Sequence, residues 1–448
     1  MTGQPGVTHM KLLAFFRGKS RISLFAGMLA TALAFVLAGP AQAALKIDIT
    51  GGTETGVPIA VVPFEQPGRV GDLARIISDD LARSGLFAPI AREAMPGRPA
   101  RPEQLRIDDW RAGKARYLVM GQVDDQGDRL QARFYLIDVS SGERIAGSQI
   151  TAAAAAERSI AHRISDIVYE ELTGERGAFS TRLAYVTERG QGDDKTYTLQ
   201  VADSDGANPQ TVLESPYPIM SPSWSPDGKK LAHVSFEGNR SAIWVQDLTT
   251  GERYQLTAFP GINGAPAWSP RGDKIAVTLS KGGSPDIYVI DLDTRRLVQW
   301  TRSGAIETEP SWYPDNRSLA FTSDRYGQPQ IFRQDGPNES ATRLTFDTPY
   351  AAGPRISPDG KNLAMLVRGA GGFFVAEQSL DNGLQRLLSR DGGEERPSYA
   401  PNGAMVVYAT QSGSGSVLKI SPVIGGEPQT LRYDQGKVRD PVWGPFND

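Results

Sequence analysis

The chain of 448 residues contains no cysteine and only three histidines. Without cysteine, disulfide bonds and thiolate chemistry are excluded, so stability must come from the burial of a core. The sequence also lacks the G-x-S-x-G turn of a serine hydrolase, and Gly18-Lys19-Ser20 lacks the upstream glycine of a phosphate-binding loop. A cysteine nucleophile is therefore excluded, and histidine, the most common general base, is scarce.

Only one long uncharged run occurs, at residues 22–39, and it follows the cations Lys11, Arg17, Lys19 and Arg21. Together with the A-x-A pattern that ends at Ala43, this run predicts a secretory signal peptide over residues 1–43, cleaved between Ala43 and Ala44. The alternative is an uncleaved membrane anchor, because 18 uncharged residues stand at the lower limit for crossing a bilayer.

An excess of positive charge is missing as well. Removal of residues 1–43 leaves 44 Lys and Arg against 51 Asp and Glu, a net charge of about −7. A general nucleic-acid partner requires a basic patch, so this balance argues against one.

What the sequence does contain is a motif that occurs six times, first as Pro222-Ser223-Trp224. Its prolines are separated by 44, 44, 44, 43 and 44 residues and stand at Pro222, Pro266, Pro310, Pro354, Pro397 and Pro441. A period of this length, filled with short apolar runs, is typical of a β-propeller blade. Ser225-Pro226-Asp227-Gly228 has the residues of a type I turn, and strand-like runs such as Leu231-Ala232-His233-Val234 follow the turns. The pattern predicts about four strands a blade.

The last repeat indicates how the ring closes. Trp443 has only five residues after it, too few for a second strand, whereas Leu183-Ala184-Tyr185-Val186 is a strand without a preceding repeat. The 266 residues of 183–448 also match six periods of 44. We therefore expect the C-terminal strand to complete a blade that begins at Leu183, which would remove exposed sheet edges.

A different pattern precedes the repeats. Residues 57–62, 117–123, 130–139 and 144–150 read as strands, and the apolar residues of 70–81 and 160–172 fall at helical spacing before Gly85 and Gly174. The predicted fold class is thus an all-β six-bladed propeller with a smaller N-terminal α/β domain. Its parts are a signal peptide at 1–43, an extended segment at 44–56, the α/β domain at 57–173, a linker at 174–182 and the propeller at 183–448.

The whole chain after residue 43 resembles the TolB family, the periplasmic component of the Tol-Pal system of Gram-negative bacteria. The residues that carry this resemblance are 57–64, 174–179 followed by 183–186, 263–266, and 308–310 with 321–324. The resemblance implies a protein that binds proteins, with no catalytic residues, no metal and no cofactor. It also implies a role in keeping the outer membrane intact and in drawing it inward during cell division.

In that family, an extended N-terminal segment binds the inner-membrane protein TolA. The matching residues are Ala44, Leu45, Lys46, Ile47, Asp48, Ile49, Thr50, Gly51, Gly52, Thr53, Glu54 and Thr55. Leu45, Ile47 and Ile49 alternate, so the segment could add as a strand to a partner's sheet. The alternative is an ordinary disordered chain end.

The family's propeller binds the outer-membrane lipoprotein Pal at one mouth of its channel, through loops that lead into the inner strands. The corresponding loops here are 261–265, 305–309, 348–353, 392–396 and 435–440, and Ile262 departs from the polar residue expected there. The predicted Pal-binding residues are Asn263, Gly264, Ala265, Thr308, Glu309 and Tyr350. Other envelope proteins are expected partners too, and contact with membranes is expected only through partners.

Two other functions remain open from the residues themselves. A hydrolase-like propeller enzyme would need catalytic groups, but His233 aligns with packing residues of the other repeats, and His162 is expected to be solvated on a helix. Asp203-Ser204-Asp205-Gly206 resembles part of a calcium loop, yet it lacks the terminal glutamate, so a β-turn is expected. A glycan-binding or peptidoglycan-binding module could use Trp300, Tyr326 and Tyr350 as stacking platforms, although these residues would equally fit a core or a rim.

Overall fold

A computed structural model describes residues 56–68, 70–413, 415–431 and 436–447. The predicted signal peptide and the predicted TolA-binding segment at residues 44–55 lie outside these described residues. No helix in the described ranges is long and apolar enough to cross a membrane.

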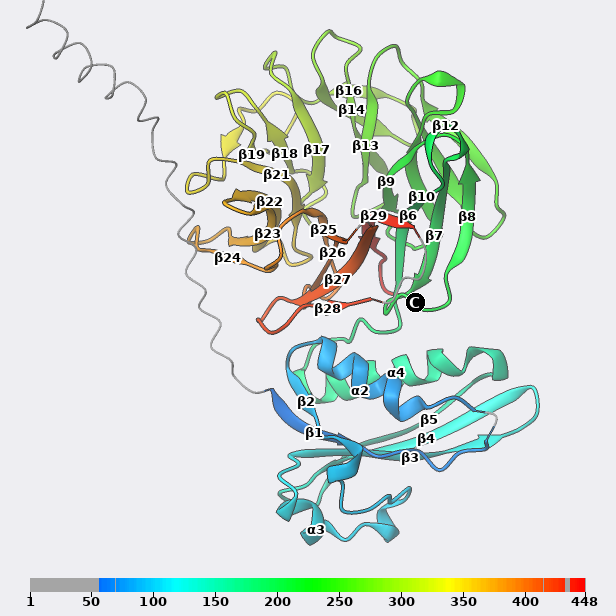
Figure 1. The fold of residues 1–448 in the computed structure, drawn as a ribbon. Helices are drawn as coiled ribbons and strands as arrows, with labels where there is room; N and C mark the ends of the chain where they lie inside the picture. Colours follow the sequence, from blue (N-terminus) through cyan, green and yellow to red (C-terminus); the bar gives the residue numbers. More distant parts are fainter. Residues whose placement is uncertain (1–55, 69, 414, 432–435, 448) are drawn as a thin grey trace, which may run out of the picture. The chain divides into compact units, whose positions relative to one another are not determined.

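The N-terminal part is a five-stranded sheet with helices on both faces (Figure 1). Its strand order is β2-β1-β3-β4-β5, with β1 parallel to both neighbours and the remaining pairs antiparallel. The strands are β1 (Val57–Val61), β2 (Phe87–Pro89), β3 (Tyr117–Asp125), β4 (Arg129–Asp138) and β5 (Arg144–Ala153). The four predicted strands are confirmed, whereas the three-residue β2 carries too short a pattern to be predicted.

Helices α2 (Leu73–Arg83) and α4 (Glu157–Thr173) pack together on one face of this sheet. Asp72 caps α2 by accepting a hydrogen bond of 3.1 Å from the Arg75 amide, and Gly174 ends α4 with a φ of 77° that suits glycine. Both predicted helices are confirmed. The opposite face carries α3 (Ile107–Ala112), a helix of six residues that the sequence did not predict, with Trp110 buried against Leu118 and Met120.

Short 3₁₀ turns connect elements of both the N-terminal part and the C-terminal part of the chain. They lie at Arg92–Ala94, Pro102–Gln104, Ala154–Ala156, Gly192–Asp194 and Glu237–Asn239.

The C-terminal part is a ring of six four-stranded antiparallel sheets (Figure 1). The first blade contains β29 (Lys437–Trp443), β6 (Arg182–Arg189), β7 (Thr196–Asp203) and β8 (Gln210–Ser215), in that order. Trp443 pairs with Leu183 and Val442 pairs with Ala184. The predicted closure, in which the C-terminal strand completes the first blade, is therefore confirmed.

Each of the other five blades uses four consecutive strands, with the innermost first. The strands are β9 (Ile219–Trp224), β10 (Lys230–Ser235), β11 (Ala242–Asp247), β12 (Arg253–Thr257), β13 (Asn263–Trp268), β14 (Lys274–Leu279), β15 (Asp286–Asp291), β16 (Leu297–Gln299), β17 (Glu307–Trp312), β18 (Leu319–Ser323), β19 (Gln330–Gln334), β20 (Thr342–Arg343), β21 (Ala351–Ile356), β22 (Asn362–Gly369), β23 (Gly372–Ser379), β24 (Gln385–Leu387), β25 (Glu394–Tyr399), β26 (Met405–Ser412), β27 (Gly415–Pro422) and β28 (Gln429–Thr430).

Turns equivalent to Ser225-Pro226-Asp227-Gly228 join the first and second strands of these blades. The Gly228 amide donates to the Ser225 carbonyl at 2.9 Å, and Gly272 bonds Ser269 in the same way at the same distance. Gly228 has a φ of 66°, in the left-handed region that glycine adopts at low cost. The predicted turns are confirmed, and they fix the register of each hairpin.

One large apolar cluster joins the α/β part to the first and last blades. It contains Ile164 and Tyr169 of α4 together with Tyr185 of β6, Leu418 of β27 and Trp443 of β29. The Tyr169 ring contacts the rings of Phe87 and Phe179 edge to face, at centroid distances of 6.3 and 5.8 Å. Burial raises the pKa of the Tyr169 hydroxyl to about 12, so this ring stays neutral. The predicted domain boundaries stay a prediction.

Candidate functional site at the propeller channel

The innermost strands β9, β13, β17, β21, β25 and β29 share one irregularity. In every one of them the pairing with the next strand shifts register at the repeat proline. The residue before each proline has a positive φ: Ser221 (51°), Ala265 (46°), Glu309 (57°), Gly353 (63°), Arg396 (35°) and Asp440 (51°). We call these six residues the bulge ring.

The bulge ring is under backbone strain. Residues other than glycine pay about 1–3 kcal/mol to adopt a left-handed conformation, and a following proline restricts the preceding residue further. Proline itself is tolerated because an innermost strand has a free edge, where no amide is needed for pairing. A bulge redirects the side chain of the strained residue, so the repeat places six such positions around one channel.

Three charged members of the bulge ring are linked across the channel. Arg396 donates through Nε to Asp440 Oδ1 at 3.1 Å, and its Nη2 lies 3.6 Å from Glu309 Oε1. Arg396 Nη1 also donates to Ser221 Oγ at 2.7 Å, while the Ser221 amide donates to Asp440 Oδ2 at 3.0 Å. Glu309 Oε2 accepts from the Gly353 amide at 3.0 Å. Five of the six blades are thus connected through the ring.

The carboxylates of the channel favour the charged form of Arg396. Burial opposes the charge of Arg396, but Asp440 and then Glu309 outweigh it, so its pKa lies above the usual value. For Arg355, which follows Pro354, burial first and Arg396 second outweigh the opposing charges of Glu309 and Asp440 and lower its pKa to about 10. A cavity of about 260 Å³ lies beside these side chains, lined among others by Glu309, Arg355, Arg396 and Trp443. The charged lining makes this cavity suitable for a polar or charged group of a binding partner.

The predicted Pal-binding residues occupy different environments at this mouth. Asn263 is fully buried, and its amide group binds the Phe259 backbone at 3.0 and 2.7 Å, so it shapes its own loop. Gly264 and Ala265 lie at the bulge of β13. Thr308 bonds Thr278 at 3.2 Å, and Glu309 belongs to the bulge ring.

Tyr350 is half-buried, and its ring centroid lies 5.2 Å from that of Phe373. The structure therefore brings Glu309 and its neighbours into the channel and leaves only part of the predicted set accessible.

Sequence reasoning missed the exposed apolar residues of the same mouth as a group. Ile262 is 49% exposed and Ile306 is 52% exposed, 44 residues apart at equivalent places before β13 and β17. Tyr326 and Phe346 are 71% and 68% exposed. The Ile306 amide donates to Asp324 at 2.8 Å, which places the Tyr326 turn beside the Ile306 loop. The repeat period of 44 residues could have identified Ile262 and Ile306 as residues at equivalent positions of neighbouring loops.

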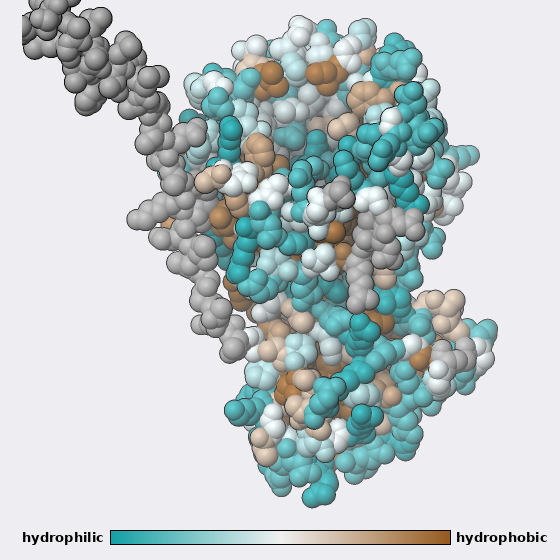
Figure 2. All heavy atoms as spheres, viewed as in Figure 1, coloured by the Kyte–Doolittle hydropathy of each residue, from teal (hydrophilic) through white to brown (hydrophobic). Residues whose placement is uncertain are grey.

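The face of the molecule drawn in Figure 2 is not predominantly apolar. Figure 2 shows most of the visible residues in teal and white, with a few brown residues among them. Trp300, expected as a possible glycan platform, is instead buried against Trp312 at a centroid distance of 6.1 Å. Exposed apolar side chains clustered on loops are therefore a local property that points to protein contact.

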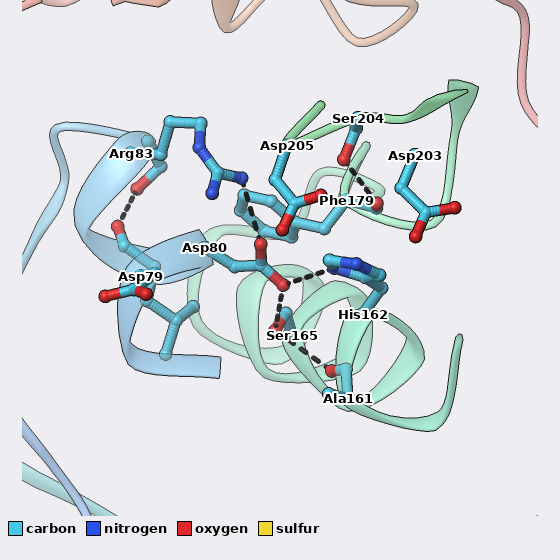
Figure 3. A network of polar contacts seen from close by, with 12 residues as sticks. Asp79, Asp80, Arg83, Ala161, His162, Ser165, Phe179, Asp203, Ser204 and Asp205 are labelled. Atoms are coloured by element: carbon cyan, nitrogen blue, oxygen red, sulfur yellow. Dashed lines mark hydrogen bonds and ion pairs between the residues drawn. The ribbon is translucent and has the colours of Figure 1, made fainter. Parts of the chain in front are cut away.

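The histidines behave in two different ways. His233 is fully buried opposite Trp244, as its alignment with packing residues predicts, and burial lowers its pKa to about 4. The expectation that His162 is solvated is wrong. His162 is 2% exposed, with Nδ1 2.8 Å from Asp80 Oδ2, because α4 packs against α2 as well as against the turn that follows β7 (Figure 3).

Comparison with known proteins agrees with this architecture. The family model described as "TolB beta propeller domain" matches residues 169–447, and the model described as "TolB amino-terminal domain" matches residues 45–145. The chain is similar to a Tol-Pal system protein TolB of Nitrosococcus oceani, 56% identical over 94% of this chain and 98% of that protein. It is similar to the one of Methylococcus capsulatus at 56% identity, over 92% of this chain and 97% of that protein.

A solved structure shows the same fold. The TolB crystal structure from Acinetobacter baumannii superimposes with a TM-score of 0.81 at 40% sequence identity, covering 88% of this chain and 98% of that one. Family models, relatives over almost the whole length and a shared fold all agree. The chain therefore belongs to the TolB family and is a non-enzymatic component of a Tol-Pal system.

Proposed function

We propose that this chain is a periplasmic docking protein that binds the outer-membrane lipoprotein Pal at the channel mouth and the inner-membrane protein TolA through residues 44–55. Membership of a Tol-Pal system implies contact with other components of that system. By holding both partners, the chain would help to keep the outer membrane intact and to draw it inward during cell division.

The observation that carries the Pal proposal is the combination of exposed apolar loops with a charged channel. Ile262 and Ile306 are about half exposed, and they stand on short loops tied down by hydrogen bonds to Ser280 and Asp324. Ordered apolar side chains bind at low entropic cost, and the charges of Arg396, Asp440 and Glu309 give specificity for a polar group from the partner.

The Pal proposal is tested with Ile262→Asp combined with Ile306→Asp, titrated with purified Pal. We expect a loss of affinity of at least tenfold, because apolar contacts at an interface centre are replaced by charge. The matched control is Leu384→Asp, since Leu384 is 72% exposed on a turn at the other end of a blade. Equal affinities for both variants would remove these loops from the Pal site.

The TolA proposal rests on the resemblance and on the alternating Leu45, Ile47 and Ile49. Its test is deletion of residues 44–55, compared by thermal melting and by binding to purified TolA. We expect TolA binding to be lost and the melting temperature to stay unchanged. Retained binding would contradict the proposal for this segment without touching the Pal site.

The cellular role is tested by complementation. The host is a strain that lacks its own TolB and releases periplasmic protein into the medium. Expression of this chain should stop that release, whereas the double Ile262 and Ile306 variant should not. If the parent chain and the variant both stopped the release, outer-membrane integrity would not depend on Pal binding at these loops.

A further inference from the structure

Three possible metal ligands meet where α4 lies against the first blade (Figure 3). His162 comes from α4, whereas Asp203 ends β7 and Asp205 follows in the turn. One ligand atom from each of them lies within 4.8 Å of the other two. Groups separated by 41 residues of chain therefore converge on one small volume.

His162 presents a free ring nitrogen to this volume. Its Nε2 is buried and has no hydrogen-bond partner among the described residues, while Nδ1 lies 2.8 Å from Asp80 Oδ2. Asp80 is held in turn by Arg83 at 2.9 Å and by Ser165 at 2.8 Å. In the neutral ring, a carboxylate acceptor keeps the proton on Nδ1 and leaves the lone pair on Nε2, the arrangement found behind metal-binding histidines.

The two carboxylates are held in place by their own turn. The Gly206 amide donates to the Asp203 carbonyl at 2.8 Å, and the Ala207 amide donates to Asp205 Oδ1 at 3.1 Å. The predicted β-turn is thus confirmed, and it aims both carboxylates at His162. The side chains of Asp203 and Asp205 are 30% and 16% exposed, so water can complete a coordination shell.

A cation already stands at this position. Arg158 donates through Nε to Asp203 Oδ2 at 3.3 Å and through Nη2 to Asp205. The carboxylates of Asp80, Asp203 and Asp205 nevertheless outnumber the guanidinium groups of Arg83 and Arg158 by one negative charge. The Arg158 side chain is 25% exposed, so it can turn toward water when another cation takes its place.

We propose that His162, Asp203 and Asp205 bind a divalent transition-metal ion, zinc in preference to calcium or magnesium, in competition with Arg158. One imidazole and two carboxylates, with water in the fourth position, form a donor set suited to zinc. Calcium and magnesium favour oxygen ligands alone. The bound ion would fasten α4 to the first blade, because its ligands come from both.

Zinc chloride titrated calorimetrically into the full chain, prepared without a histidine tag, tests this site. We expect one saturable ion per chain, at least tenfold weaker binding for Asp205→Asn, and at least threefold tighter binding for Arg158→Gln, in which the competing charge is gone. The control is Asp247→Asn, since Asp247 ends β11 as Asp203 ends β7 but lies 44 residues further along the repeat. It should bind zinc as the parent chain does.

X-ray absorption of the zinc complex gives an independent readout, in which one imidazole and carboxylate oxygens are expected. Asp205→Asn is the deciding variant because its side chain is near the surface and its shape is conserved, whereas His162→Gln changes a buried group. The proposal is overturned if the parent chain shows no saturable zinc site, if Asp205→Asn binds as tightly as the parent, or if Arg158→Gln binds no tighter.

Discussion

The indole Nε1 of Trp443 donates a hydrogen bond of 2.8 Å to Thr181 Oγ1, 262 residues earlier in the chain. Trp443 is 5% exposed, and its backbone amide donates to Ser398 Oγ of the neighbouring blade at 3.0 Å. One residue therefore joins the first blade, the last blade and the entry to the propeller.

Truncation of this residue should weaken the ring strongly. Trp443→Ala removes a buried aromatic side chain, a change that costs about 3–5 kcal/mol, and we expect a clear drop in the midpoint of urea denaturation. Trp443→Phe keeps most of the volume and should lose about 1 kcal/mol with the hydrogen bond. Unchanged midpoints for Trp443→Ala would contradict closure by β29.

Arg396 should be coupled to Asp440. Arg396→Met leaves Asp440 and Glu309 without their shared cation, and because the Arg396 side chain is 23% exposed we expect a loss of about 2 kcal/mol. Asp440→Asn in the same background should cost less than it does alone. Urea denaturation of both single variants and the double variant measures the coupling, and additive losses would show that the pair is energetically independent.

His233 should make stability depend on pH. Its pKa is about 4 in the folded chain, because burial disfavours the charged ring, against 6.5 when unfolded. The unfolded chain therefore binds the proton first as the pH falls. His233 therefore contributes fully to the free energy of unfolding above a pH of about 6.5, and this contribution is lost as the pH falls toward 4. The loss amounts to about 2 kcal/mol by pH 5.

His233→Phe isolates this effect, since Phe321 occupies the equivalent place in another blade. The free energy of unfolding should fall by about 2 kcal/mol less between pH 7 and pH 5 in the variant than in the parent chain. Because the comparison is between differences, a constant packing cost of the larger ring cancels. Parallel pH profiles would show that His233 does not titrate in this range.

Strain in the bulge ring should appear as unequal effects of two small substitutions on the free energy of unfolding. Gly353→Ala forces a residue with a Cβ into a φ of 63° and should cost about 1 kcal/mol. The added Cβ itself meets nothing closer than the Glu309 carboxylate at 3.9 Å, so the cost is conformational. Ala265→Gly relieves the same strain while adding freedom to the unfolded chain, and its stability should change little. A stable Gly353→Ala variant would argue against strain.

The propeller could be predicted from sequence because its repeat exposes the same turn and strand at fixed spacing. The prolines marked each innermost strand, and the lone strand at Leu183 marked the seam. The bulge at each proline was not predicted. It follows from pairing with the neighbouring strand, which a run of residues read alone does not reveal.

The burial of His162 could not be predicted for a similar reason. Helical spacing identifies the face of α4 that meets the sheet, where Ile160 and Ile164 lie. His162 instead faces α2 and the turn at Asp203, and both neighbours are distant in sequence. A helix with several packed sides has no clear polar face, so periodicity assigned this one wrongly.

Closure by β29 also sets the order in which the molecule can be completed. Strand β6 is synthesised early, yet its inner edge stays without a partner until the last residues of the chain emerge. The face of α4 that shares an apolar core with Trp443 and Leu418 is likewise not covered until these late residues have been synthesised. The free edge of β6 and the apolar face of α4 would therefore stay exposed throughout synthesis, and such exposure favours misassembly. Nascent chains of this protein should therefore depend on a holding chaperone until translation ends.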